Sequence, residues 1–155
     1  MGESNLSNLA LYSARPTLRI DGQDNAMASA LLQSLVMREQ EGALSSLEAT
    51  FVNFTARESG QVGPAFEDEQ VLKLGAELKV YAGEAAAPTE IFAGRVSALE
   101  FAFDSEGPPR LIVQAEDPAQ QARMTRRIAV YAQQSVAAIA RTVASRLGLT
   151  ATVTG

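Results

Sequence analysis

The sequence contains no cysteine, no histidine and no tryptophan among its 155 residues. Without cysteine the chain cannot form disulfides, thiolate nucleophiles or cysteine-ligated metal sites. Without histidine it has no Ser-His-Asp relay, no two-histidine zinc site and no side chain whose ordinary pKa lies near neutrality. The chemistry left open is that of carboxylates, lysine and tyrosine.

Long apolar runs and basic clusters are also missing. No apolar run approaches the roughly 20 residues that span a bilayer, and the start of the chain lacks the basic and apolar parts of a signal peptide. The 13 basic and 18 acidic side chains give a net charge of −5, and no basic stretch is long enough to follow a phosphate backbone. These features predict a globular protein that is made in a cytoplasm and has neither nucleic acid nor membrane as a partner.

Alternating apolar residues predict strands in the first third of the chain. A strand is expected over Thr17–Ile20, where Asp21-Gly22 then supplies a tight turn and the chain doubles back. The period of Leu31–Glu39 fits helix or strand, and its place before a turn favours strand. With the alternating run Ser46–Thr55 it would form a hairpin.

The middle of the chain contains the clearest strand pattern. Over residues 72–80 the pattern places apolar side chains on one face, namely Leu72, Leu74, Ala76, Leu78 and Val80. Ile91–Phe103 changes phase near Ala98-Leu99, which indicates a bulge or bend. Leu111, Val113 and Ala115 continue as its partner strand.

The last third turns helical. Asp117-Pro118 predicts the capped start of a helix that runs to about Arg127. Ser135 is expected to cap a second helix, which ends at Gly148. Brief strands are expected over Ile128–Tyr131 and Leu149–Thr154. The expected fold class is mainly β (α+β), a bent antiparallel barrel or sandwich followed by two short helices. We expect one domain over residues 1–128 and the start of a second, incomplete domain over 129–155.

Three stretches carry a family resemblance. They are the strand, turn and hairpin of Tyr12–Phe54, the paired strands FEDEQVLKLGAELKVYAG (Phe66–Gly83) and IFAGRVSALEFAF (Ile91–Phe103), and the passage Ala115–Val153. In this order they resemble the hub proteins of contractile tails, the family of phage late control protein D, VgrG-like spike proteins and central baseplate hubs. The resemblance covers most of the chain.

The resemblance implies a structural, non-enzymatic role. Hubs of this family form homotrimers whose barrel domains make a ring, and they link the tail tube to the spike and baseplate proteins. The chain would then be assembled in a bacterial cytoplasm into the tail of a virion or an injection machine. It would have no catalytic, cofactor-binding or metal-binding residues.

Several carboxylates are candidates for a site. Asp104, Glu106, Glu116 and Asp117 flank one hairpin and could form an acid-base pair or a calcium site, but turn and cap roles explain them better. Glu67-Asp68-Glu69 is better explained as a solvated turn than as a metal site.

Several basic residues are candidates for contacts with a partner protein, although each also has a structural explanation. Arg123, Arg126 and Arg127 would lie near the end of the first helix, where they offset the negative helix end and could meet an acidic partner. Lys73 and Lys79 fit the solvent-exposed face of a strand, although they could also form interface contacts.

Two other function classes stay open. Residues 135–150 have the helix-and-glycine rhythm of a peptidoglycan-binding LysM repeat, although the lack of tryptophan and the presence of only three tyrosines weaken a sugar-binding interpretation. A carboxylate hydrolase would need an acid pair in a cleft, and the sequence gives no sign of one.

Overall fold

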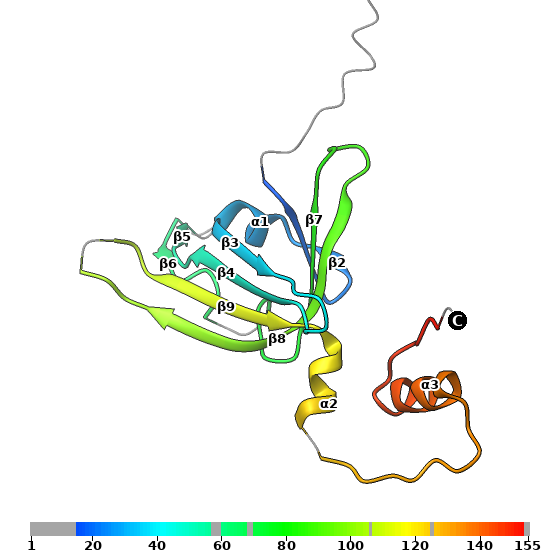
Figure 1. Cartoon of the computed structure of the whole chain (residues 1–155). Helices are drawn as coiled ribbons and strands as arrows, with labels where there is room; N and C mark the ends of the chain where they lie inside the picture. The colour runs from blue at the N-terminus through cyan, green and yellow to red at the C-terminus, as the bar shows by residue number, and fades with distance from the viewer. Residues whose placement is uncertain (1–14, 57–59, 68–69, 106, 125, 154–155) are drawn as a thin grey trace, which may run out of the picture. The chain divides into compact units, whose positions relative to one another are not determined.

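The computed structural model describes residues 15–56, 60–67, 70–105, 107–124 and 126–153 (Figure 1). The elements are β1 (Thr17–Ile20), β2 (Gln23–Asp24), α1 (Ala26–Leu31), β3 (Leu32–Arg38), β4 (Ser46–Val52), β5 (Thr55–Ala56), β6 (Val62–Gly63), β7 (Glu77–Ala82), β8 (Thr89–Ala102), β9 (Arg110–Glu116), the 3-10 turn η2 (Pro118–Gln120), α2 (Gln121–Met124) and α3 (Val136–Arg146). Contacts divide the chain into two compact units, unit 1 over Met1–Glu116 and unit 2 over Asp117–Gly155. That residues 129–155 open a further domain stays a prediction.

Unit 1 is built on an antiparallel seven-stranded sheet in the order β2-β1-β7-β8-β9-β4-β3. The expected mainly β fold is therefore confirmed, and among the described strands it is a bent open sheet, because β2 and β3 lie at opposite ends of the strand order. The 14 residues of β8 let it serve two hairpins, with β7 along its first half and with β9 along its second. Figure 1 shows how the two hairpins diverge from this shared strand.

The bend of the sheet has a local cause in β8. The register of its pairing with β9 shifts between Val96 and Ala98, so that Ser97 is an extra residue on the bulged strand. A bulge increases the twist of a strand and redirects it. The bulge expected near Ala98-Leu99 is thereby confirmed, slightly earlier in the chain.

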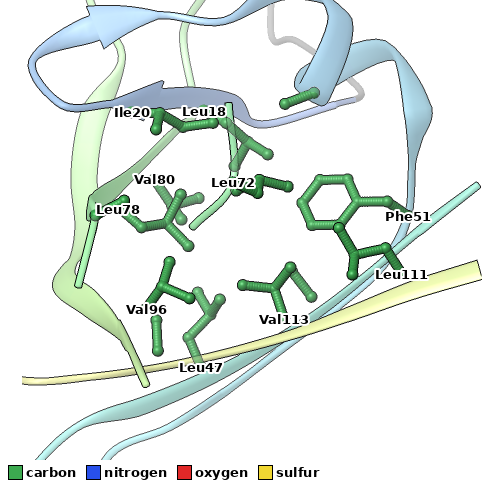
Figure 2. Packing of buried hydrophobic residues seen from close by; sticks show 14 of the residues in the cluster. Leu18, Ile20, Leu47, Phe51, Leu72, Leu78, Val80, Val96, Leu111 and Val113 are labelled. Carbon is green, nitrogen blue, oxygen red and sulfur yellow. The ribbon is translucent and has the colours of Figure 1, made fainter. Parts of the chain in front are cut away.

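Alternation packs one face of the sheet into a single core. On β4 and β9 the odd-numbered apolar residues are all buried, namely Leu47, Ala49, Phe51, Leu111, Val113 and Ala115. Figure 2 shows side chains of β1, β4, β7, β8 and β9 pointing into the same space. The rings of Phe51 and Phe66 meet edge to face with centroids 5.5 Å apart, an arrangement that aromatic pairs favour.

The loop before β7 departs from the strand pattern expected for residues 72–80. Leu72 is buried, but Leu74 is 65% exposed. The chain turns at Gly75, whose φ of +80° is unfavourable for other residues, and β7 begins only at Glu77. The predicted strand was therefore too long at its start.

The buried Asn53 holds a second loop against the core. Its side-chain oxygen accepts hydrogen bonds of 2.9 Å from the backbone N–H groups of Ala65 and Phe66. Its own N–H donates to the Pro109 carbonyl at 2.7 Å. One amide side chain thus satisfies two backbone donors and places Phe66 beside Phe51.

The start of the chain confirms the first strand and adds a helix after it. β1 covers the expected Thr17–Ile20, and the Asp21-Gly22 turn has positive φ angles. After the two residues of β2 the chain forms α1, because Asn25 caps that helix by accepting a 2.8 Å bond from the Ala28 N–H. The expected hairpin of β3 and β4 is confirmed.

In unit 2 the second predicted helix is present, and the first is shorter than predicted. Ser135 caps α3 as expected, and Gly148 comes after it with a φ of +69°. α2 ends at Met124 and not near Arg127, so that helix was predicted too long. Within the described part of unit 2, neither residues 128–131 nor 149–153 form the expected strands.

Candidate functional site

The candidate carboxylates do not gather in one place. Asp104 forms an ion pair with Arg110 at the start of β9, whereas Glu116 lies at the other end of that strand, roughly 20 Å away at the rise of an extended chain. Asp117 caps η2 by accepting a 2.7 Å bond from the Ala119 N–H. The turn and cap roles expected for Asp104 and Asp117 are thus seen.

Part of the acidic set lies outside the described residues, namely Glu106, Asp68 and Glu69. Among the residues that the structure does describe, no group of three His, Cys, Asp or Glu side chains could hold a metal ion. The expectation of no metal site stays a prediction for the chain as a whole.

The candidate lysines have acidic neighbours. Lys73 Nζ lies 3.7 Å from Asp21 Oδ2, and Lys79 Nζ lies 3.2 Å from Glu90 Oε2. These pairs link β7 and the loop before it to the β1 turn and to β8. Charge pairing within unit 1 therefore accounts for both lysines.

Lys79 belongs to a polar network on the outer face of β1, β7 and β8. The Tyr81 hydroxyl donates a 2.8 Å hydrogen bond to Glu90 Oε2, and the Arg19 guanidinium lies 4.9 Å from the centre of the Tyr81 ring. Arg19 also pairs with Asp24 at 2.8 Å. With Asp24 on β2, the network joins four strands, β2, β1, β7 and β8, through side chains.

The same contacts shift the pKa values of the network. The hydrogen bond from Tyr81 lowers the pKa of Glu90 below its ordinary 4.5, and the carboxylate in turn raises the pKa of Tyr81 above its ordinary 10.0. Bonding to Glu90 also raises the pKa of Lys79. The network therefore keeps its charges near neutral pH, which suits a structural role better than proton transfer.

A second place of interest is a hollow on unit 2 with a volume of about 280 Å³. It is lined by Gln121, Ala122, Arg127, Ala129, Tyr131, Val143, Arg146 and Leu147. Arg146 lies 5.8 Å from the centre of the Tyr131 ring and donates a 3.3 Å hydrogen bond to its hydroxyl. The hollow thus combines two guanidinium groups, an aromatic ring and an apolar wall.

The chain segment that lines this hollow has two different sides. Arg127, Ala129 and Tyr131 line the hollow, whereas Ile128 and Val130 between them do not and are 94% and 92% exposed; Arg127 and Ala129 are exposed as well. Such alternation is the period of an extended strand. The segment expected to form a strand therefore keeps the alternation of one, although it has no partner strand among the described residues.

Only some of the residues that line this hollow had a signal in the sequence. Arg127 was expected at a helix end, but α2 stops at Met124 and leaves Arg126 and Arg127 on the alternating segment. Only Arg123 lies in the last helical turn, where it was expected. Arg146 had no sequence signal of its own, since it meets Tyr131 only through the packing of α3.

A second hollow lies on unit 1, beside the β8 bulge. It is lined by Arg38, Ser46, Leu47, Glu48, Ser97, Ala98, Gln114, Ala115 and Glu116. Its charged side chains are one arginine and two glutamates. It therefore presents a mildly acidic surface at the end of β3.

Comparison with known protein families gives one match. The sequence profile of the Alg8 N-terminal domain matches residues 58–155. The match therefore includes β7, β8 and β9 of unit 1 and the whole of unit 2. No curated protein matches the chain.

This match corrects the resemblance to contractile-tail hubs. Proteins of the Alg8 type are membrane-associated glycosyltransferases, so the expected hub function, the non-enzymatic role and the location in a tail particle are all contradicted. The match gives no support to a LysM repeat either, and the oligomeric state stays a prediction. Among the described residues no helix is long and apolar enough to cross a bilayer. The match spans more than half of the sequence, and the chain belongs to the family of the Alg8 N-terminal domain.

Proposed function

We propose that this chain is part of a glycosyltransferase and that the hollow on unit 2 binds the diphosphate and sugar of a nucleotide-sugar donor. One observation carries the proposal: the matched stretch, residues 58–155, contains every residue that lines the hollow. Family membership gives the class of reaction by analogy. The residues that line the hollow give the location of the proposed donor-binding site.

The charge of the hollow suits an anionic ligand. Arg127 and Arg146 both line it, and none of its eight lining residues is acidic. A guanidinium binds phosphate oxygens through two parallel N–H donors and keeps its charge at any physiological pH. The two arginines would therefore hold the diphosphate.

The remaining wall suits the rest of the donor. The Tyr131 ring offers an apolar face with a polar hydroxyl at its edge, as sites for flat or sugar-like rings do. Val143 and Leu147 supply the apolar side of the hollow. The volume of about 280 Å³ is near the lower end for ligand sites, roughly 300 Å³, so it would hold part of the donor.

Calorimetric titration of the chain with UDP-glucose and with GDP-mannose tests the proposal. We expect saturable binding of at least one of them. Replacing Arg146 by Gln should weaken it by roughly tenfold or more, because a charge-assisted hydrogen bond contributes about 1.5–3 kcal/mol. The matched control is Arg141→Gln, which removes an exposed arginine of the same helix that does not line the hollow.

Two results would overturn the proposal. One is the absence of saturable binding of both nucleotide sugars at millimolar concentration by a folded chain. The other is equal binding by Arg146→Gln and Arg141→Gln, which would show that a general positive charge attracts the ligand. Nucleotide release during incubation with the donor and a saccharide acceptor would test sugar transfer itself.

A further inference from the structure

The alternating segment of unit 2 lacks a neighbouring strand. In the described part of the chain no backbone hydrogen bond joins residues 126–132 to another strand. Ile128 and Val130 are nonetheless almost fully exposed. An alternating, apolar segment with open N–H and C=O groups is suited to join the edge of a sheet.

Unit 1 offers such an edge in β3. This strand of seven residues pairs only with β4, so its other side is open among the described strands. Leu35 and Met37 pack against the core but stay partly exposed. Val36 on the opposite face is 43% exposed. An added strand would cover the rim of the core and satisfy the open backbone groups.

The charges of the two units differ in sign. Unit 2 carries five arginines and one aspartate, a net charge of +4, so unit 1 carries −9 of the total of −5. β3 itself leads into the exposed Glu39 and Glu41. The segment begins with Arg126 and Arg127. Opposite charges therefore favour contact of the segment with the end of β3.

An antiparallel register satisfies both the apolar and the charged positions. It sets Val130 beside Leu35, Ile128 beside Met37 and Arg126 beside Glu39. Cross-strand neighbours of these kinds stabilise sheets.

The same register brings Arg127 to Arg38. Arg38 shares its hollow with Glu48 and Glu116, so the surroundings that Arg127 would meet are still acidic. The repulsion between the two guanidinium groups is thereby offset.

We propose that the segment Arg126–Ala132 of one copy pairs antiparallel with the edge strand β3 of a second copy. Each copy carries both a segment and an edge, and a second copy satisfies them reciprocally. Such an exchange closes into a two-fold dimer in which each segment and each edge is used once. The observations behind this pairing differ from those behind donor binding, so either can fail alone.

Cysteine cross-linking tests the pairing directly, because the chain has no cysteine of its own. The proposed register sets Ala129 opposite Val36, within the distance that a cross-strand disulfide can bridge. We therefore expect a mixture of singly substituted Ala129→Cys and Val36→Cys chains to form a covalent dimer on mild oxidation. The control mixture pairs Ala129→Cys with Leu74→Cys, a more exposed apolar position outside β3.

The mass of the unmodified chain gives a second readout. Light scattering over a concentration series should rise from 16.4 kDa toward twice that value, and salt should weaken the association. Val130→Asp should weaken it by about tenfold or more, whereas Leu74→Asp, with the same charge change, should leave it unaltered.

Three results would overturn the proposal. A monomer at every concentration excludes the second copy. Equal cross-linking in the test and control mixtures shows that the cysteines meet by random collision of the chains and not by strand pairing. A disulfide that forms in the doubly substituted chain but never between mixed single variants shows that the segment folds back on its own β3.

Discussion

A single added methyl group at Gly94 should cost much of the stability of unit 1. Gly94 lies in the middle of β8, next to the residue that pairs with the end of β9. A Cβ atom built at Gly94 would lie 2.5 Å from Cζ of Phe92 and 2.6 Å from the carbonyl oxygen of Glu116. Ordinary contacts of a Cβ are 3.4–4 Å, so Gly94→Ala forces the ring and the backbone apart.

Neither neighbour can move freely. Phe92 is 4% exposed and belongs to the core, so its ring has little room to turn. Glu116 pairs with both Arg95 and Ser46, and this pairing holds its carbonyl in place. Overpacking of this kind costs about 1–3 kcal/mol, and we expect the upper half of that range because one of the clashing atoms belongs to the backbone.

Urea unfolding followed by far-ultraviolet circular dichroism measures the change. With a denaturant slope of roughly 2 kcal/mol per molar urea, the midpoint should fall by about 1–1.5 M. The matched control is Gly107→Ala, where a Cβ meets nothing within 4 Å. Equal midpoints for Gly94→Ala and Gly107→Ala would show that β8 tolerates the methyl group and that the close approach is not rigid.

Three further changes test other parts of the structure. Asn53→Ala leaves two backbone N–H groups without their acceptor and should lower the free energy of unfolding by roughly 2–4 kcal/mol; a loss below about 1 kcal/mol in urea unfolding would contradict the role of Asn53. Because the pKa of Glu90 is lowered in the folded state, its contribution to stability is present above pH 4.5 and is lost as the pH falls through the folded pKa. A carboxyl titration followed by NMR should give a pKa for Glu90 below 4.5, and Tyr81→Phe should move it upward; an unmoved value would rule out the hydroxyl as the cause. Ser135→Ala removes the acceptor for the Ala138 N–H at the start of α3 and should cost about 0.5–2 kcal/mol, seen as faster amide exchange in that helix and not in β9.

Most strands of unit 1 could be predicted because alternation determines which face of a half-buried strand meets the core. Thr17–Ile20 was predicted to the residue, and the buried positions of β4 and β9 follow the alternation. The β8 bulge was visible as a break in that alternation. Periodicity thus carries information wherever one face of a strand is buried and the other is wet.

Turns that depend on one backbone angle were less predictable. The apolar pattern of residues 72–80 continues through Leu74, but the positive φ of Gly75 ends the alternation in space before β7 begins. Likewise the cap of α1 is the single residue Asn25, and the six residues of that helix are too few for a helical period to show. Local backbone geometry overrode the pattern in both places.

The hollow on unit 2 could be predicted only in part. Arg127 and Tyr131 lie close in sequence and share one face of an alternating segment, so alternation alone would group them. Arg146 joins them from the last turn of α3, 15 residues beyond Tyr131 in the chain. That meeting depends on how the helix packs, which no periodicity encodes.

One segment would serve both the donor and the neighbouring copy. Residues 127, 129 and 131 line the hollow, while residues 128 and 130 are exposed on the other face. A ligand held by Arg127 and Tyr131 would fix the segment in the form that a neighbouring β3 could pair with. The entropy of ordering the segment would then be lost once for both events, so each would favour the other by the same factor. Donor affinity should therefore rise with chain concentration if the copies pair through this segment, and it should be independent of concentration if they do not.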